Sequence, residues 1–276
     1  MKLIFRCITC FLCCFLFIAH SVYAQESKLD KLILSKKGYS QNAYPHANAV
    51  FSFAVMDPGV VLVPVAGGIY LAGWQKWFLM PSKKTLSFAA DYCKPDSSIY
   101  FFATDKTKSF VLKSAGDEKK AAFVKIVEMP AGVYGLKAVS AKVLWIWGKQ
   151  DGFWGIWKYD YKQLKLVYKT DLAIVDVAPL NENNLAVATT HSILTVGSKQ
   201  APREVIKMDV EIDGLAINYD ATLFVSTEKG ILHYLSPEFA EDAEVVTYGI
   251  HGVLRRYQKS LYVLWQEDNQ VVGIKL

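Results

Sequence analysis

The sequence predicts an all-β fold, a six-bladed β-propeller, from three observations. A strand of β-branched and aromatic residues recurs six times at intervals of about 40 residues, each copy lies within the same order of strands and turns, and the repeat continues to the last residue. A four-stranded propeller blade is about 40–45 residues long in WD-type repeats. We therefore expect six sheets of four antiparallel strands around a central channel.

The recurring strand is the second strand of each expected blade. Its six copies are residues 60–63, 99–102, 143–146, 185–188, 223–226 and 261–264. An apolar strand precedes each copy, and a third strand follows after a tight turn such as Asp151-Gly152 or Lys229-Gly230. Glycine and aspartate tolerate the backbone conformations that reverse the chain between antiparallel strands.

The two ends of the repeat predict how the ring closes. The sixth repeat supplies three strands, which leaves an unpaired strand edge. Residues 29–35 have the composition of a strand, so we expect residues 31–35 to pair with residues 270–275. This N-terminal strand would close the last blade. The alternative is a disordered N-terminal tail.

The N-terminus also predicts export. Lys2 and Arg6 precede an apolar run over residues 7–19, and small residues lead to a cleavage site after Ala24. The run is too short for a membrane span. We expect a signal peptide at residues 1–24, an N-terminal segment with the ring-closing strand at 25–47, and the propeller domain at 48–276. The predicted location is the bacterial periplasm or the extracellular space.

Cysteine content and charge narrow the class of protein. Removal of the signal peptide leaves only Cys93, so disulfides are not expected to stabilise the fold. The formal charge of +5 is small and spread along the chain, which argues against nucleic acid as a partner. We found no motif for a cofactor, and none is expected.

The strand order and repeat length resemble the β-propeller superfamily over nearly the whole mature chain. The sequence has neither the Trp-Asp dipeptide of WD repeats nor the double glycine of kelch repeats. It also lacks the calcium-binding loops of other propellers. It is closest in kind to bacterial exported propellers of the regulator-propeller or quinoprotein-like type. A shared fold of this breadth implies no activity by itself.

Aligned innermost strands place three polar residues near one mouth of the channel. Asp176, Asp213 and His251 come from consecutive repeats and are candidate catalytic residues. Two carboxylates and an imidazole can hold a divalent cation or act as general acid and base. This set is similar to that of gluconolactonase-like six-bladed enzymes, but the early glutamate and asparagine ligands of that family have no counterpart. The alternative is that these residues cap turns or line a wet channel.

Aromatic residues crowd into the third repeat. Trp154 and Trp157 are candidate ligand-binding residues, because large aromatic rings stack on sugars and anchor peptides. The alternative is core packing, since each blade is covered on both faces by its neighbours. The pair Arg255 and Arg256 is expected to be solvated.

These features favour a non-enzymatic exported propeller that acts as a protein- or ligand-binding scaffold, with a protein or peptide partner. A metal-dependent hydrolase or lactonase at the channel mouth and a carbohydrate-binding propeller are the two alternatives. No residue set is a confident metal site.

Overall fold

A computed structural model describes most of the chain after residue 52 and one short strand before it. The described residues are 32–34, 53–57, 60–65, 68–72, 76–79, 86–104, 109–115, 122–130, 132–235, 239, 243–267 and 270–275. The predicted signal peptide lies outside these residues. Within them, no helix has the length and apolar character needed to cross a membrane.

The described strands form six four-stranded antiparallel sheets, which we call blades one to six. Blades one to three are β2 (Ala54–Asp57), β3 (Val60–Val65), β4 (Gly68–Ala72) and β5 (Lys76–Leu79); β6 (Leu86–Cys93), β7 (Ser98–Thr104), β8 (Ser109–Ala115) and β9 (Ala122–Met129); and β10 (Gly132–Ser140), β11 (Val143–Gln150), β12 (Phe153–Tyr159) and β13 (Leu164–Thr170).

Blades four to six complete the set. They are β14 (Ile174–Pro179), β15 (Asn184–Thr189), β16 (Ser192–Gly197) and β17 (Arg203–Lys207); β18 (Ile212–Ile217), β19 (Leu223–Thr227), β20 (Gly230–Tyr234) and β21 (Ala243–Tyr248); and β22 (Val253–Tyr257), β23 (Ser260–Glu267), β24 (Gln270–Lys275) and β1 (Leu32–Leu34). All six recurring strands of the repeat are the second strands of their blades.

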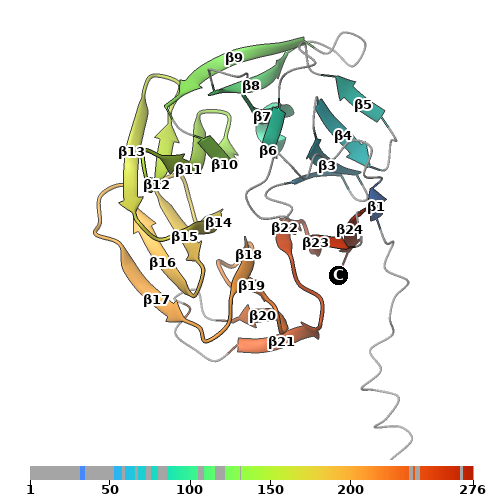
Figure 1. Ribbon diagram of the computed structural model, residues 1–276, viewed down its shortest axis with the longest axis vertical. Helices are drawn as coiled ribbons and strands as arrows, with labels where there is room; N and C mark the ends of the chain where they lie inside the picture. Colours follow the sequence, from blue (N-terminus) through green and yellow to red (C-terminus); the bar gives the residue numbers. More distant parts are fainter. Residues whose placement is uncertain are drawn as a thin grey trace, which may run out of the picture. The chain divides into compact units, whose positions relative to one another are not determined.

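The blades form a closed ring. The first strand of each blade contacts the first strand of the next, and β22 of the last blade contacts β2 of the first. Figure 1 shows the sheets following one another around a common axis in chain order. The six-bladed propeller predicted from the repeat is thereby confirmed.

The N-terminal strand closes blade six as predicted. β1 pairs with β24 in an antiparallel register that matches Leu32 to Gly273, Ile33 to Val272 and Leu34 to Val271. Pairing the two ends of the ring removes an exposed strand edge from the last blade. A strand from the start of the chain thus ties blade six to the rest of the ring.

The core lies between neighbouring blades. Trp145 and Trp147 of β11 are fully buried against blade four, whereas Trp157 of β12 packs with residues of blade two such as Tyr100 and Phe102. Strand side chains alternate between the two faces of a sheet, so a blade sandwiched by two others buries both sets. This packing accounts for most aromatic residues of the third repeat.

Candidate functional site

Bulges in the first strands aim polar side chains at one mouth of the channel. In β18 the register shifts between Ile212 and Gly214, so Asp213 has no cross-strand partner. Such a bulge redirects the extra residue away from the regular ladder. Asp213 Oδ2 lies 2.8 Å from Nδ1 of His251, which precedes β22.

The backbones of β18 and of the residues before β22 lie very close together at this mouth. A Cβ atom added at Gly214 would lie only 2.8 Å from the carbonyl oxygen of Gly252, and Gly252 itself has a positive φ of 147°. Only glycine adopts that backbone conformation without strain. The two glycines therefore bring β18 and β22 close enough for Asp213 and His251 to meet.

Asp176 has a different role from the other two predicted residues. Its side chain is 1% exposed and accepts hydrogen bonds from the backbone N–H groups of Val177 (2.9 Å) and Leu215 (3.0 Å). It also accepts one from Nη1 of Arg255 at 2.9 Å. Asp176 thus joins β14, β18 and β22 inside the ring, and its two oxygens are already engaged.

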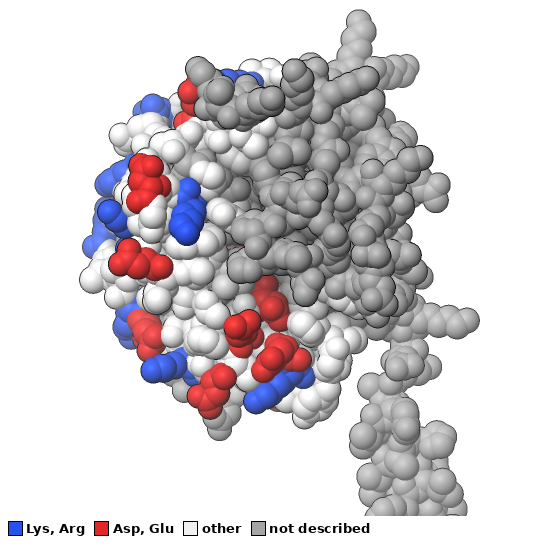
Figure 2. Space-filling model, viewed as in Figure 1, with Lys and Arg blue, Asp and Glu red and all other residues white. Residues whose placement is uncertain are grey.

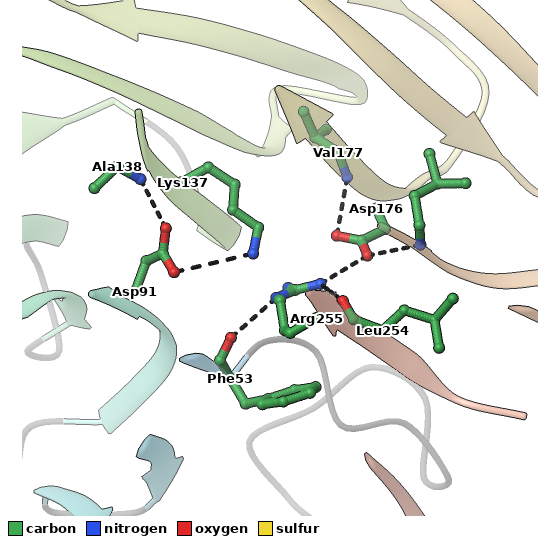
Figure 3. Close-up of polar contacts among 9 residues, drawn as sticks. Phe53, Asp91, Lys137, Ala138, Asp176, Val177, Leu254 and Arg255 are labelled. Carbon is green, nitrogen blue, oxygen red and sulfur yellow. Dashed lines mark hydrogen bonds and ion pairs between the residues drawn. The ribbon is translucent and has the colours of Figure 1, made fainter. Parts of the chain in front are cut away.

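The prediction that Arg255 is solvated is wrong. The residue is 5% exposed rather than solvated. Its Nε donates to the carbonyl oxygen of Phe53 at 2.9 Å and its Nη1 donates to that of Leu254 at 2.6 Å (Figure 3). Arg255 therefore links blade six to blades one and four.

The three predicted catalytic residues do not form a metal-binding group. Asp213 and His251 are paired with each other, while Asp176 is paired with Arg255. Within the described part of the chain, no set of three or more His, Cys, Asp or Glu side chains is arranged to hold a metal ion. The predicted residues thus belong to two separate ion pairs.

The acidic surroundings of Asp213 influence its proton affinity. Burial raises the pKa of the Asp213 carboxyl, its hydrogen bond with His251 lowers it, and the nearby Glu211 and Glu228 raise it, with a net upward shift. Acidic side chains also gather over blade five on the face drawn in Figure 2. We call the end of the channel at Asp213 and His251 the acidic mouth.

The two tryptophans named as ligand candidates lie in the blade packing. Trp157 is 3% exposed and offers no open face for stacking. Trp154 is partly buried against the core shared by blades three and four, with its ring 4.7 Å from that of Tyr134. Of these two candidates, Trp154 alone is partly exposed and could stack on a sugar.

A pocket opens at the other end of the channel. Its volume is about 290 Å³, and its described lining comes from all six innermost strands and from the segments that follow β6, β18 and β22. Lys94, Lys137, Arg255 and Arg256 line it, and Asp91 is the one acidic residue among the lining residues that the structure describes. We call this end the cationic mouth.

Tyrosines accompany the cations. Tyr92, Tyr219 and Tyr257 also line the pocket, and Tyr219 is 81% exposed. Lys94 Nζ lies 5.7 Å from the centroid of the Tyr257 ring. Positive charge beside aromatic rings suits an anionic ligand that also carries apolar or planar groups.

Arg256 has unused hydrogen-bonding capacity at this mouth. Its guanidinium lies over the ring of Phe224 at 5.6 Å, and burial lowers its pKa. Its Nε is buried and has no hydrogen-bond partner among the described residues.

Deeper in the pocket, Asp91 of β6 and Lys137 of β10 face each other (Figure 3). Asp91 Oδ1 lies 4.0 Å from Lys137 Nζ, and Asp91 Oδ2 accepts a hydrogen bond from the Ala138 N–H at 2.8 Å. Burial and the nearby Arg255 lower the pKa of Lys137, Asp91 and Asp176 raise it, and the net result is about 8. Lys137 is thus an amine that changes charge near neutral pH.

A short 3₁₀ helix, η3 (Lys94–Asp96), carries Lys94 at the rim and is fixed by Asp96. The Asp96 carboxylate accepts a hydrogen bond from Tyr100 at 2.8 Å and pairs with Lys113 Nζ at 2.9 Å. Burial raises the pKa of Asp96, but the bonds from Lys113 and Tyr100 outweigh it and bring the value to about 2. Burial and the Asp96 contact raise the pKa of the Cys93 thiol to about 12, which leaves it unreactive.

Comparison with solved structures gives the same architecture. A nidogen from a nidogen/laminin complex has a TM-score of 0.60 at 14% identity, covering 75% of this chain and 89% of the other. A gluconolactonase from Xanthomonas campestris scores 0.61 at 11% identity, with 93% of each chain covered. YCF48 bound to D1 peptide scores 0.55 at 9% identity, covering 89% of this chain and 83% of the other.

The chain is a β-propeller. At these identities the likeness shows the fold alone. No family model matches the sequence, and no curated protein matches it. The propellers that share this architecture include binding proteins and enzymes, so activity has to be argued from the two mouths of this propeller.

Proposed function

We propose that this protein is an exported, non-enzymatic binding module that holds an acidic segment of a partner protein at its cationic mouth. The observation that carries the proposal is the composition of the pocket. Its described lining residues include four cationic side chains, of which Arg255 is paired with Asp176, three tyrosines and one carboxylate. Complementary charge steers association and fixes register, while tyrosine supplies contact area.

The placement of the groups supports this function. Lys94 and Tyr219 are at the rim, Arg256 lies further in, and Lys137 is at the base. A pocket of about 290 Å³ is near the lower end of small-ligand sites and admits one or two side chains of a peptide. The known structures of nidogen with laminin and of YCF48 with D1 peptide show propellers with protein or peptide partners.

The test is a binding titration with a simple acidic peptide. Fluorescein-labelled hexaglutamate should bind the purified protein, whereas hexaglutamine and hexalysine should not, and the affinity should fall as salt rises. The double variant Lys94→Ala and Arg256→Ala should weaken binding by roughly tenfold or more, as expected for loss of two charged contacts. Lys162→Ala removes an exposed lysine from blade three and should leave affinity unchanged.

Two results would contradict the proposal. One is equal binding of hexaglutamate to the wild type and to the double variant, which would place any acidic site elsewhere. The other is equal binding of the three peptides, which would mean that charge does not select the ligand. Circular dichroism of the double variant serves as the check that the propeller remains folded.

A further inference from the structure

The Lys137 side chain is the one amine at the base of the cationic mouth. The Lys137 side chain is 12% exposed and lines the pocket, so a molecule small enough to enter the pocket can reach it. Its ion-pair partner among the described residues is Asp91, whose Oδ1 lies 4.0 Å from Nζ, beyond hydrogen-bond length. The amine therefore faces the pocket without a direct hydrogen bond to Asp91.

Charged groups around Lys137 come from every inner strand packed near it. Asp91 lies on β6, Asp176 on β14 and Arg255 on β22, while Lys94 and Arg256 lie toward the rim. Asp176 and Arg255 bond to each other and to backbone groups, so neither is available to hold the amine (Figure 3). Arg255 disfavours a second positive charge beside it, and burial does the same.

We propose that Lys137 is a covalent site that forms an imine with a small aldehyde bearing a carboxylate or phosphate. The neutral amine attacks the carbonyl carbon, and the carbonyl π electrons move to oxygen, giving a carbinolamine after proton transfer. Water then leaves with both protons of the original amine, and a C=N bond replaces the C=O bond. The step is a reversible condensation, so it needs no oxidant or reductant.

The pocket explains both parts of the ligand class. Neutral amine is required for attack, and a lysine with a pKa of about 8 is roughly one quarter neutral at pH 7.5, against about one in a thousand for an ordinary lysine. The anionic group is favoured because Lys94 and Arg256 line the same cavity. Lower basicity makes each neutral amine less nucleophilic, so the net advantage over a surface lysine is about tenfold rather than several hundredfold.

The experiment is reductive trapping on the intact protein. The protein is incubated with 4-carboxybenzaldehyde and cyanoborohydride, and the modified lysines are located and timed by peptide mass mapping. Lys137 should be modified about ten times faster than the exposed Lys162 and Lys165. The exposed lysines are mostly protonated up to about pH 10, so the ratio of the Lys137 rate to theirs should fall as the pH rises above about 8.

Two controls address charge and identity. The methyl ester of the same aldehyde lacks the negative charge and should lose most of the preference for Lys137, after correction against a free model amine. The Lys137→Arg variant keeps the positive charge and should lose the fast modification while Lys162 and Lys165 react as before.

Modification of Lys137 no faster than that of the exposed lysines, or a ratio of the two rates that stays constant from about pH 7 to pH 9, would overturn the proposal. Equal rates with the acid and its methyl ester would show that the site does not prefer an aldehyde that carries a negative charge. This inference does not depend on the acidic partner. Hexaglutamate binding is tested through Lys94 and Arg256, and imine formation is read directly at Lys137, so either can fail without the other.

Discussion

The two mouths of the channel differ in charge and in space, although both are made by the same six innermost strands. The acidic mouth, at the start of those strands, holds Asp213 and His251 as a partly exposed pair with Glu211 and Glu228 nearby. The cationic mouth, at their ends, holds a pocket lined by lysines, arginines and tyrosines. The six blades have the same strand order, and a few side chains make the two ends of the channel chemically different.

A buried ion pair lies on the inner strands between these two groups of residues. Arg255 and Asp176 are 6% and 1% exposed at their side chains and connect blades six and four across the channel. Buried charges are tolerated when they are paired and hydrogen-bonded, and here Nε and Nη1 of Arg255 also donate to the backbone carbonyls of Phe53 and Leu254. We therefore interpret Asp176 as a structural link and not as part of the acidic mouth.

The largest expected effect comes from breaking this pair. Arg255→Met should lower the free energy of unfolding by about 3 to 5 kcal/mol, because Asp176 is left as a buried, uncompensated charge. Urea denaturation followed by circular dichroism measures the change. The double variant Arg255→Met with Asp176→Asn should recover a large part of the loss, since no unpaired charge remains.

A loss of less than 1 kcal/mol in Arg255→Met would show that the pair is not a link between the mouths. A double variant as unstable as the single one would show that packing or the backbone hydrogen bonds of Arg255, rather than charge, dominate its contribution.

A smaller effect is expected from Lys137 in the pH dependence of stability. Its pKa is about 8 in the folded protein and near 10.5 in the unfolded chain. Between these values the unfolded chain binds more protons than the folded one, so this residue makes stability rise with pH across that window. Lys137 lowers the free energy of unfolding most below pH 8, and this destabilisation disappears above about pH 10.5.

Lys137→Met should remove that rise. The stability of the variant relative to wild type should fall by roughly 3 kcal/mol from pH 8 to pH 10.5, as measured by urea denaturation at several pH values. Lys162→Met, at an exposed site, should show no such change. A flat difference between Lys137→Met and wild type across this window would mean that Lys137 is ordinarily basic in the folded protein.

The repeat made the fold predictable, and the reasons are local. Each second strand combines apolar residues on both faces with a turn on either side, so residues 60–63 and its five copies mark the blades without any tertiary information. The closing strand was also predictable, because three strands in the sixth repeat leave an edge that residues 31–35 can pair with.

The cationic mouth was not predictable from the same pattern. Lys94, Asp91 and Lys137 are isolated charges in or beside otherwise ordinary strands, and nothing in their spacing brings them together. Register shifts in the first strands, such as that between Ser87 and Ala89 in β6, change which residues face the channel. Alignment of the repeats therefore found the starts of the strands, where Asp213 and His251 do meet, and missed the pocket at their ends.

The smallest expected effect separates the two mouths directly. Asp213→Asn keeps a hydrogen-bond acceptor for His251 but removes the charge, and partly exposed ion pairs of this kind contribute about 0 to 1 kcal/mol. The affinity for hexaglutamate at the cationic mouth should change by less than about twofold, as measured by fluorescence anisotropy. The free energy of unfolding should change by less than about 1 kcal/mol.

The same variant addresses the hydrolase alternative. If Asp213 and His251 held a metal ion with a ligand outside the described residues, Zn²⁺, Mn²⁺ or Ca²⁺ would raise the melting temperature of the wild type, and Asp213→Asn would abolish that rise. Under our assignment the wild type and Asp213→Asn respond equally to each metal. A rise specific to the wild type would move the functional site to the acidic mouth, because a bound cation there would supply the chemistry that the Asp213 and His251 pair lacks alone.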